Sequence, residues 1–232
     1  AEGAPELAAD LSDLEVAIND GIDFIVEAKE KDDRGPRLWR SGPFGTSTDE
    51  CNVQHGAGGI LGALCFLHHG RKDERLLPVI RDVSLWIQQR LAQRQRFLPG
   101  MYFGASGPIW ANLEAAKILG DDQLRDSLVE MILRLPTRWP NPDICHGSAG
   151  AGLALCRAWL HVKDSRLLQS IIDCADGLIA SVKENDDGIY WQVDDDFDST
   201  LRGLKQYGFA HGIAGVGYFL LAAGLVADRP KY

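Results

Sequence analysis

The sequence predicts an all-α protein built from repeated helical hairpins, and three observations support this prediction. A short signature, His-Gly-x-x-Gly or Phe-Gly-x-x-Gly, recurs four times, and each copy opens an apolar run rich in Ala, Leu and Gly. Amphipathic segments with a helical period alternate with these runs. Only one short stretch, residues 189–193, reads as a possible β-strand. Such a repeat is typical of stacked hairpins in an α/α-toroid or an α-solenoid, and periodicity alone does not choose between the two.

The four signature copies begin at intervals of 48, 43 and 65 residues, counted between their first glycines. Because glycine lacks Cβ, two glycines in a first helical turn let the backbone approach a neighbour closely and leave N–H groups accessible. If several such helices lie side by side, their N-termini meet on one surface that gathers partial positive charge. This surface is the predicted place for a site. The copies are His55 to Gly59, Phe103 to Gly107, His146 to Gly150 and His211 to Gly215.

The expected elements alternate between outer, amphipathic helices and inner helices that a signature opens. The first outer helix is predicted over residues 7–31, and residues 32–52, rich in Gly, Pro, Ser and Thr, are predicted to form a loop. Inner helices are expected over residues 54–70, 103–120 and 147–162 and from residue 211 onward, and further outer helices over residues 76–91, 123–135 and 165–182.

Local signals place two of the boundaries. Gly120 is expected to end the second inner helix, and Asp121 to N-cap the outer helix that follows. Residues 185–205 interrupt the repeat, with a turn at Asp186-Asp187-Gly188 and a short strand over residues 189–193. The acidic run 194–196 is expected to be solvated loop, and no chemistry is assigned to it.

The composition narrows the class of protein. A chain of 232 residues that is 45% hydrophobic can bury a sizeable core within one domain. A net charge of −9 without a basic stripe beside the aromatic residues argues against a nucleic-acid partner. No apolar run reaches membrane-spanning length, so no membrane partner is expected. Five scattered cysteines and no signal peptide predict a reducing, cytoplasmic setting.

Three of the six histidines stand at one position of the signature, directly before its first glycine. These are His55, His146 and His211. Imidazole suits proton transfer near neutral pH, and a helix N-terminus disfavours imidazolium, which leaves a histidine there available as a base or ligand. Each ring alone could equally fill a helix start, but the shared position makes at least one of them a functional candidate.

Asp143 and its neighbours are the other candidates. Asp143 follows a proline-rich approach and either orients a histidine or substrate amide, or caps a helix; both interpretations stay open. Cys145 and His146 form an alternative metal pair, because thiolate and imidazole bind zinc, but two adjacent ligands supply only part of a tetrahedral site and no metal ligand is assigned. Cys65 and Cys156 share one position of the repeat and are expected to be buried thiols.

Two stretches of the chain resemble the lanthionine synthetase C-like cyclases: Asp143-Ile-Cys-His-Gly-Ser-Ala-Gly and Gly208-Phe-Ala-His-Gly-Ile-Ala-Gly-Val-Gly. Two further stretches are similar to the cyclase domains fused behind a kinase in class III and class IV lanthipeptide synthetases. They are Arg37-Leu-Trp-Arg-Ser-Gly-Pro-Phe-Gly-Thr-Ser-Thr-Asp and Asn52-Val-Gln-His-Gly-Ala-Gly-Gly. The resemblance covers the chain from about Arg37 onward. Its Ala-His-Gly motif with flanks is fairly specific, whereas the bare Gly-x-x-Gly is not.

The resemblance implies an α/α-toroid of seven inner and seven outer helices, of which about four inner helices are present. Residues 1–232 are then expected to be the N-terminal part of one cyclase domain. The implied activity is lanthipeptide cyclisation, the addition of a peptide cysteine thiol to dehydroalanine or dehydrobutyrine. By motif, His211 matches the proton-handling histidine and Asp143 its aspartate. The implied partners are a precursor peptide with its leader, and fused or associated kinase and lyase domains upstream.

The resemblance also implies zinc, held by two cysteines and a histidine in stretches that follow the Ala-His-Gly motif. Neither stretch occurs after His211, and Cys145-His146-Gly147 stands in the aspartate's place in the order. Zinc is therefore expected with ligands outside this chain. Two alternatives stay open: a non-catalytic relative that binds a peptide or acts as a scaffold, and an unrelated α/α-toroid glycosidase, which needs paired carboxylates.

Overall fold

A computed structural model describes residues 11–31 and 34–232 of the chain. The chain divides into two compact units, Ala1–Arg40 and Ser41–Tyr232. The first unit contains helix α1, Leu11–Glu27. Residues that follow α1 fold back within this unit: Trp39 Nε1 donates to the Ile25 carbonyl at 2.9 Å, and the Glu30 N–H donates to the Leu38 carbonyl at 2.7 Å.

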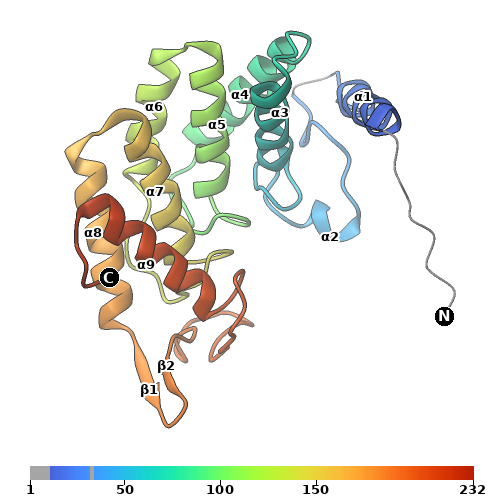
Figure 1. The fold of residues 1–232 in the computed structure, drawn as a ribbon. Helices are drawn as coiled ribbons and strands as arrows, with labels where there is room; N and C mark the ends of the chain where they lie inside the picture. The colour runs from blue at the N-terminus through green and yellow to red at the C-terminus, as the bar shows by residue number, and fades with distance from the viewer. Residues whose placement is uncertain (1–10, 32–33) are drawn as a thin grey trace, which may run out of the picture. The chain divides into compact units, whose positions relative to one another are not determined.

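The second unit confirms the predicted alternation of inner and outer helices (Figure 1). After the short helix α2, Pro43–Thr46, the inner helices α3, α5, α7 and α9 each follow a signature. The outer helices α4, α6 and α8 lie between them in the chain. The bounds are α3 Ala57–Arg71, α4 Leu76–Ala92, α5 Ser106–Leu119, α6 Asp122–Ile132, α7 Ser148–Val162, α8 Ser165–Ala180 and α9 Ile213–Ala227.

The core of this unit lies between the two sets of helices. Each inner helix packs against the next inner helix in the chain, α3 on α5, α5 on α7 and α7 on α9. The outer helices α4, α6 and α8 pack on α3, α5 and α7 through their apolar faces. Burying each large aliphatic side chain contributes about 1.5–3 kcal/mol. Fully buried side chains from both sets include Leu61, Leu64, Ile80, Ile87, Ile109, Leu113, Leu128, Ile132 and Phe219.

Helix ends follow the signals that the sequence carries. Gly120 ends α5 in the left-handed conformation at φ 62°, as predicted. The Asp121 side chain accepts the Leu124 N–H at the start of α6, so its predicted role as an N-cap is confirmed. Asp164 caps α8 in the same way by accepting the Arg166 N–H. These caps fix where the two outer helices begin.

Three predictions about elements need correction. Leu14 and Val16 of α1, which the helical period of the sequence places on its apolar face, are 48% and 58% exposed; residues 7–10 of that predicted helix lie outside the described part. The predicted loop contains α2, because Pro43 suits the first turn of a helix. The short sheet pairs β1, Lys183–Asn185, with β2, Gly188–Tyr190, and so lies earlier than predicted.

The shift of the sheet has a physical cause in Trp191. Its indole Nε1 donates to the Leu178 carbonyl of α8 at 2.7 Å, and the side chain is buried. This anchor takes the chain out of the antiparallel pair directly after Tyr190. The turn at Asp186-Asp187 joins the two strands as expected, with Asn185 paired to Gly188. Across 11–31 and 34–232, the structure holds no helix with the length and apolar character of a membrane span.

Candidate active site

The loops that precede the inner helices lie side by side and are joined by backbone hydrogen bonds. The Val53 N–H donates to the Tyr102 carbonyl at 3.1 Å, and the Met101 N–H donates to the Ile144 carbonyl at 2.8 Å. The Cys145 N–H donates to the Ala210 carbonyl at 3.1 Å. The four signatures therefore meet in chain order, and the predicted convergence of helix N-termini is confirmed.

Close backbone approach explains the glycines of the signature. A Cβ on Gly147 would lie 2.0 Å from the Asn141 carbonyl oxygen, and one on Gly150 would lie 2.1 Å from the Ile144 carbonyl oxygen. The corresponding glycines of the other three copies meet backbone carbonyls at 1.9–2.4 Å. Gly147 has an ordinary extended backbone with φ −126°, so the requirement is for space and not for a left-handed conformation.

The residues directly before the first glycines form a continuous row of rings. The His55 and Phe103 rings lie 6.1 Å apart, Phe103 stacks on His146 at 4.7 Å with an interplanar angle of 2°, and His146 lies 5.3 Å from His211. Phe44 of α2 extends the row at His55 with an edge contact at 5.1 Å. We call these five residues the ring row. It fixes the orientation of the two histidines at its far end.

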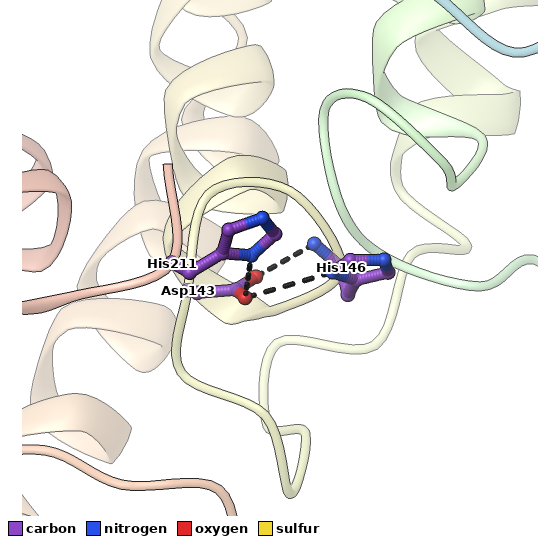
Figure 2. A group of neighbouring side chains, drawn as sticks. All are labelled: Asp143, His146 and His211. Carbon is purple, nitrogen blue, oxygen red and sulfur yellow. Dashed lines mark hydrogen bonds and ion pairs between the residues drawn. The ribbon is translucent and has the colours of Figure 1, made fainter. Parts of the chain in front are cut away.

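Asp143 lies between those two histidines (Figure 2). Its Oδ1 accepts the His146 backbone N–H at 2.6 Å, and its Oδ2 lies 3.0 Å from His211 Nδ1 and 3.6 Å from His146 Nδ1. The Asp143 N–H in turn donates to Asn141 Oδ1 at 2.9 Å. The carboxylate is only 2% exposed, whereas the His211 and His146 side chains are 33% and 31% exposed. The buried carboxylate thus holds the partly exposed His211 ring by a hydrogen bond and lies beside the partly exposed His146 ring.

The environment of Asp143 favours its ionised form. Burial by itself raises the pKa of this carboxyl, but hydrogen bonds from His146 and His211 outweigh burial and hold the pKa below its usual range. An ionised carboxylate only accepts hydrogen bonds, so His211 Nδ1 must carry the proton that it shares with Asp143. When the imidazole is neutral, the free lone pair then resides on His211 Nε2. That atom can accept a proton from a bound substrate.

The first signature copy shows that the turn before an inner helix can form without a charged residue at the position of Asp143. Asn52 occupies the position of Asp143 and its Oδ1 accepts the His55 N–H at 2.7 Å. An amide therefore closes the same turn without a charge. Gly147, not Asp143, is the N-cap residue of α7. Since the turn alone does not require a carboxylate, the negative charge of Asp143 can instead act on the His146 and His211 rings.

The metal-binding potential of the chain lies at the same place. Within the part that the structure describes, one group of three side chains brings ligand atoms together: Asp143, His146 and His211, all within 4.8 Å of one another. Cys145 is not in this group; its side chain is buried, and burial raises the pKa of its thiol to about 12. The predicted buried thiols Cys65 and Cys156 are confirmed, each with a pKa raised to about 12 by burial.

A zinc site of two cysteines and one histidine does not fit the described residues. All five cysteines are free and buried, and none contributes to a group of metal-capable side chains. Thiolate is the form that binds zinc, and a buried thiol with a raised pKa resists ionisation. The described residues therefore do not supply the two thiolate ligands that such a zinc site needs.

Sequence reasoning named His211 and Asp143 as candidates but did not predict the group of three side chains. The structure brings these two residues together and adds His146, which the sequence offered only as one of three equivalent histidines and as a partner of Cys145. Its position three residues after Asp143 was the available signal, because an aspartate commonly accepts the N–H of a residue two or three positions later. Phe44 carries no comparable signal, since it lies in the loop outside the repeat.

A comparison with known protein families matches most of the described second unit. The family described as Lanthionine synthetase C-like protein matches residues 47–232, a range that includes all four signatures and the Asp143–His211 pair. A comparison with curated proteins found no match. With an all-α repeat of glycine-led hairpins and a family match over most of its length, the chain belongs to the lanthionine synthetase C-like family.

Proposed function

We propose that this chain is a lanthipeptide cyclase domain that joins a peptide cysteine thiol to a dehydroalanine or dehydrobutyrine in a Michael-type addition. The observation that carries the proposal is the buried, ionised Asp143 held 3.0 Å from Nδ1 of the partly exposed His211. Family membership supports the class of reaction. The geometry supports the assignment of the proton-handling group within this chain.

The reaction moves one proton and forms one bond. The thiol loses its proton, the sulfur attacks the β-carbon of the dehydro residue, and the α-carbon of the resulting enolate takes up a proton. The sum of atoms and charges is unchanged, so one group that first accepts a proton and then returns it is sufficient. His211 Nε2 is that group in our proposal, because Nδ1 is engaged with Asp143 and the lone pair of the neutral ring is then on Nε2.

Asp143 assists by stabilising the imidazolium that exists between the two proton transfers. A carboxylate 3.0 Å from Nδ1 makes a charge-assisted hydrogen bond when the ring is protonated, and such bonds are about twice as strong as neutral ones. It also holds the tautomer with Nε2 unprotonated before the thiol arrives. The role matches that of a triad aspartate, which orients a histidine and remains ionised.

Two alternative functions fit less well. A glycosidase needs two carboxylates on either side of its bond, but among the described residues Asp143 is the only acidic side chain in the buried set. A non-catalytic family member that binds a peptide would use the same surface without proton transfer. Among the described buried residues, the first alternative has no second acid, and the experiment below separates the second alternative from a cyclase.

The experiment is a cyclisation assay on a synthetic peptide that carries one dehydroalanine and one cysteine. Cyclisation does not change the mass, so the free thiol is counted by alkylation and mass spectrometry, and the ring is located by fragmentation. The wild-type chain is expected to consume the thiol, and His211→Ala to lose at least about 10²-fold in rate. His69→Ala, a histidine at the exposed end of α3, is the matched control and is expected to retain the wild-type rate.

Absence of thiol consumption by the folded wild-type chain contradicts the cyclase proposal and leaves the peptide-binding alternative. Normal ring formation by His211→Ala contradicts the assignment of His211. Circular dichroism of each variant shows that a lost rate does not arise from unfolding.

A further inference from the structure

A pocket of about 460 Å³ lies beside His146 and is not used by the proton transfer described above. It is bounded by the α2 side chain Phe44, by residues that follow α4, and by the start of the second signature. A volume of this size is in the range of sites that bind small ligands or side chains. Because His146 stacks on His211 at 5.3 Å, a peptide residue in this pocket would lie close to the reacting residue.

The wall of this pocket is largely apolar. Phe44 is 66% exposed and Leu98 is 52% exposed, and both line the pocket together with Phe103. Single exposed apolar residues are common on protein surfaces, but here two of them and the Phe103 ring surround one cavity. An apolar side chain of a bound peptide would cover this wall and remove it from water.

The pocket also carries one uncompensated positive charge. Arg94 is paired with Asp49, whose Oδ1 accepts from Arg94 at 2.8 Å and from the Cys51 N–H at the same distance. Arg96 lies with its guanidinium 5.1 Å from the centre of the Trp139 ring, and no carboxylate in the described part of the chain pairs with it. The surplus is notable in a chain with a net charge of −9.

The chemistry of Arg96 selects its ligand. A guanidinium presents a planar fork of donors that matches a carboxylate, and stacking on an aromatic ring holds that fork in one orientation. The carboxylate of Asp49 does not compete, since Arg94 and the Cys51 amide already engage it. A peptide carboxylate is therefore the complementary partner.

We propose that this pocket is a substrate subsite that takes an apolar side chain of the peptide against Phe44 and Leu98 and the carboxylate of an adjacent acidic residue on Arg96. The proposal rests on the proposed function, because it identifies the ligand as the segment next to the reacting residue. It names the class of substrate: peptides in which an apolar and an acidic residue flank the ring-forming position.

The test is a binding measurement that involves no chemistry. The probes are two fluorescein-labelled octapeptides that carry Leu-Glu or Leu-Gln directly before a serine, which replaces the reacting cysteine. Fluorescence anisotropy with the full chain is expected to give an affinity about three- to tenfold higher for the Leu-Glu peptide. The difference is expected to shrink in 0.5 M salt, because screening weakens a partly exposed charge pair.

Variants of the chain locate the effect. Arg96→Gln is expected to abolish the preference for Leu-Glu, and Phe44→Ala to weaken both peptides alike. Arg81→Gln removes the same charge from an exposed site on α4, about three helical turns before its end, and is expected to keep the preference. All three side chains are exposed, so these variants are expected to fold.

Equal affinity for the two peptides would overturn the proposed subsite. So would a preference for the Leu-Glu peptide that remains in Arg96→Gln, or the absence of binding of either peptide at millimolar concentration. The outcome is independent of catalysis. A chain that prefers Leu-Glu but consumes no thiol in the cyclisation assay retains the subsite and loses the proposed function. A chain that cyclises without the preference retains the function and loses the subsite.

Discussion

Replacing Asp143 by asparagine removes the charge that the mechanism needs and keeps the turn that the fold needs. Asn52 already closes the equivalent turn in the first signature with a 2.7 Å hydrogen bond to the His55 N–H. The amide oxygen introduced by the substitution can accept the His146 N–H in the same way. We therefore expect Asp143→Asn to fold, with a change in the free energy of unfolding of about 1 kcal/mol at neutral pH.

The effect on rate follows from the distances. Asp143 Oδ2 lies 3.0 Å from His211 Nδ1, and an attraction between unit charges at this separation is worth about 5 kcal/mol at an effective dielectric constant near 20, before screening by solvent at the partly exposed ring. Losing about 3–4 kcal/mol of stabilisation from the imidazolium lowers the rate about 10²- to 10³-fold. The amide can also accept or donate toward Nδ1, which removes control of the tautomer.

The assay is the initial rate of thiol loss from the dehydrated peptide, compared among the wild type, Asp143→Asn and Asp121→Asn. The last variant makes the same change at the N-cap of α6, where asparagine caps about as well as aspartate, and is expected to keep the wild-type rate. A folded Asp143→Asn variant within threefold of the wild-type rate would refute the role assigned to the carboxylate.

The difference in stability between the wild type and Asp143→Asn is expected to depend on pH. The folded-state pKa of Asp143 lies below its usual value, so the carboxylate contributes stability that is present above the unfolded pKa near 3.9. That contribution is lost as the pH falls through the lower folded value. Denaturant unfolding between pH 5 and pH 2 is expected to show the wild type losing stability relative to Asp143→Asn; parallel curves would contradict this.

Three further predictions concern packing, a peripheral ion pair and the thiols. Gly150→Ala is expected to destabilise the fold by about 2–4 kcal/mol in denaturant melts, because its Cβ would meet backbone atoms of Ile144 and Met101, whereas Gly217→Ala, with open space around it, is expected to stabilise α9 by about 0.5–1 kcal/mol. A hydrogen bond from His161 and the charge of Arg157 outweigh burial and lower the pKa of Glu114 to about 2. Glu114→Gln is therefore expected to lower the free energy of unfolding by about 1–3 kcal/mol above pH 4.5, and this difference is expected to vanish as the pH falls toward 2. A difference that stays constant across that range would contradict the prediction. All five cysteines are buried, so a thiol reagent at pH 7.5 is expected to label them only on unfolding, and rapid labelling of the native chain would contradict the burial.

The repeat made most of the fold predictable. Each Gly-x-x-Gly marks a place where helix and loop backbones touch, and those contacts recur at all four copies. Gly120 and Asp121 marked a helix end and start because their conformational and capping preferences act locally. The predicted strand position was wrong because Trp191 donates a hydrogen bond to the Leu178 carbonyl of α8. Neither the hydrophobic period of the sequence nor the strand propensity of its residues encodes this contact.

The site was predictable only in part. Position in the signature singled out the histidines, and the family resemblance singled out His211 and Asp143. What the sequence did not contain was the spatial order of the ring row, which places His146 between Phe103 and His211. The Arg96 pocket was also missed, because its residues come from three separate segments.

The most direct test of the central claim is the tautomer of His211. Long-range ¹H–¹⁵N correlation spectra of the ¹⁵N-histidine-labelled chain, recorded at a pH where the ring is neutral, distinguish a protonated Nδ1 from a protonated Nε2. The account predicts that His211 carries its proton on Nδ1, with Nε2 unprotonated, and that Asp143→Asn disturbs this preference. A neutral His211 with its proton on Nε2 in the wild-type chain would contradict the account, because no lone pair would then face the thiol.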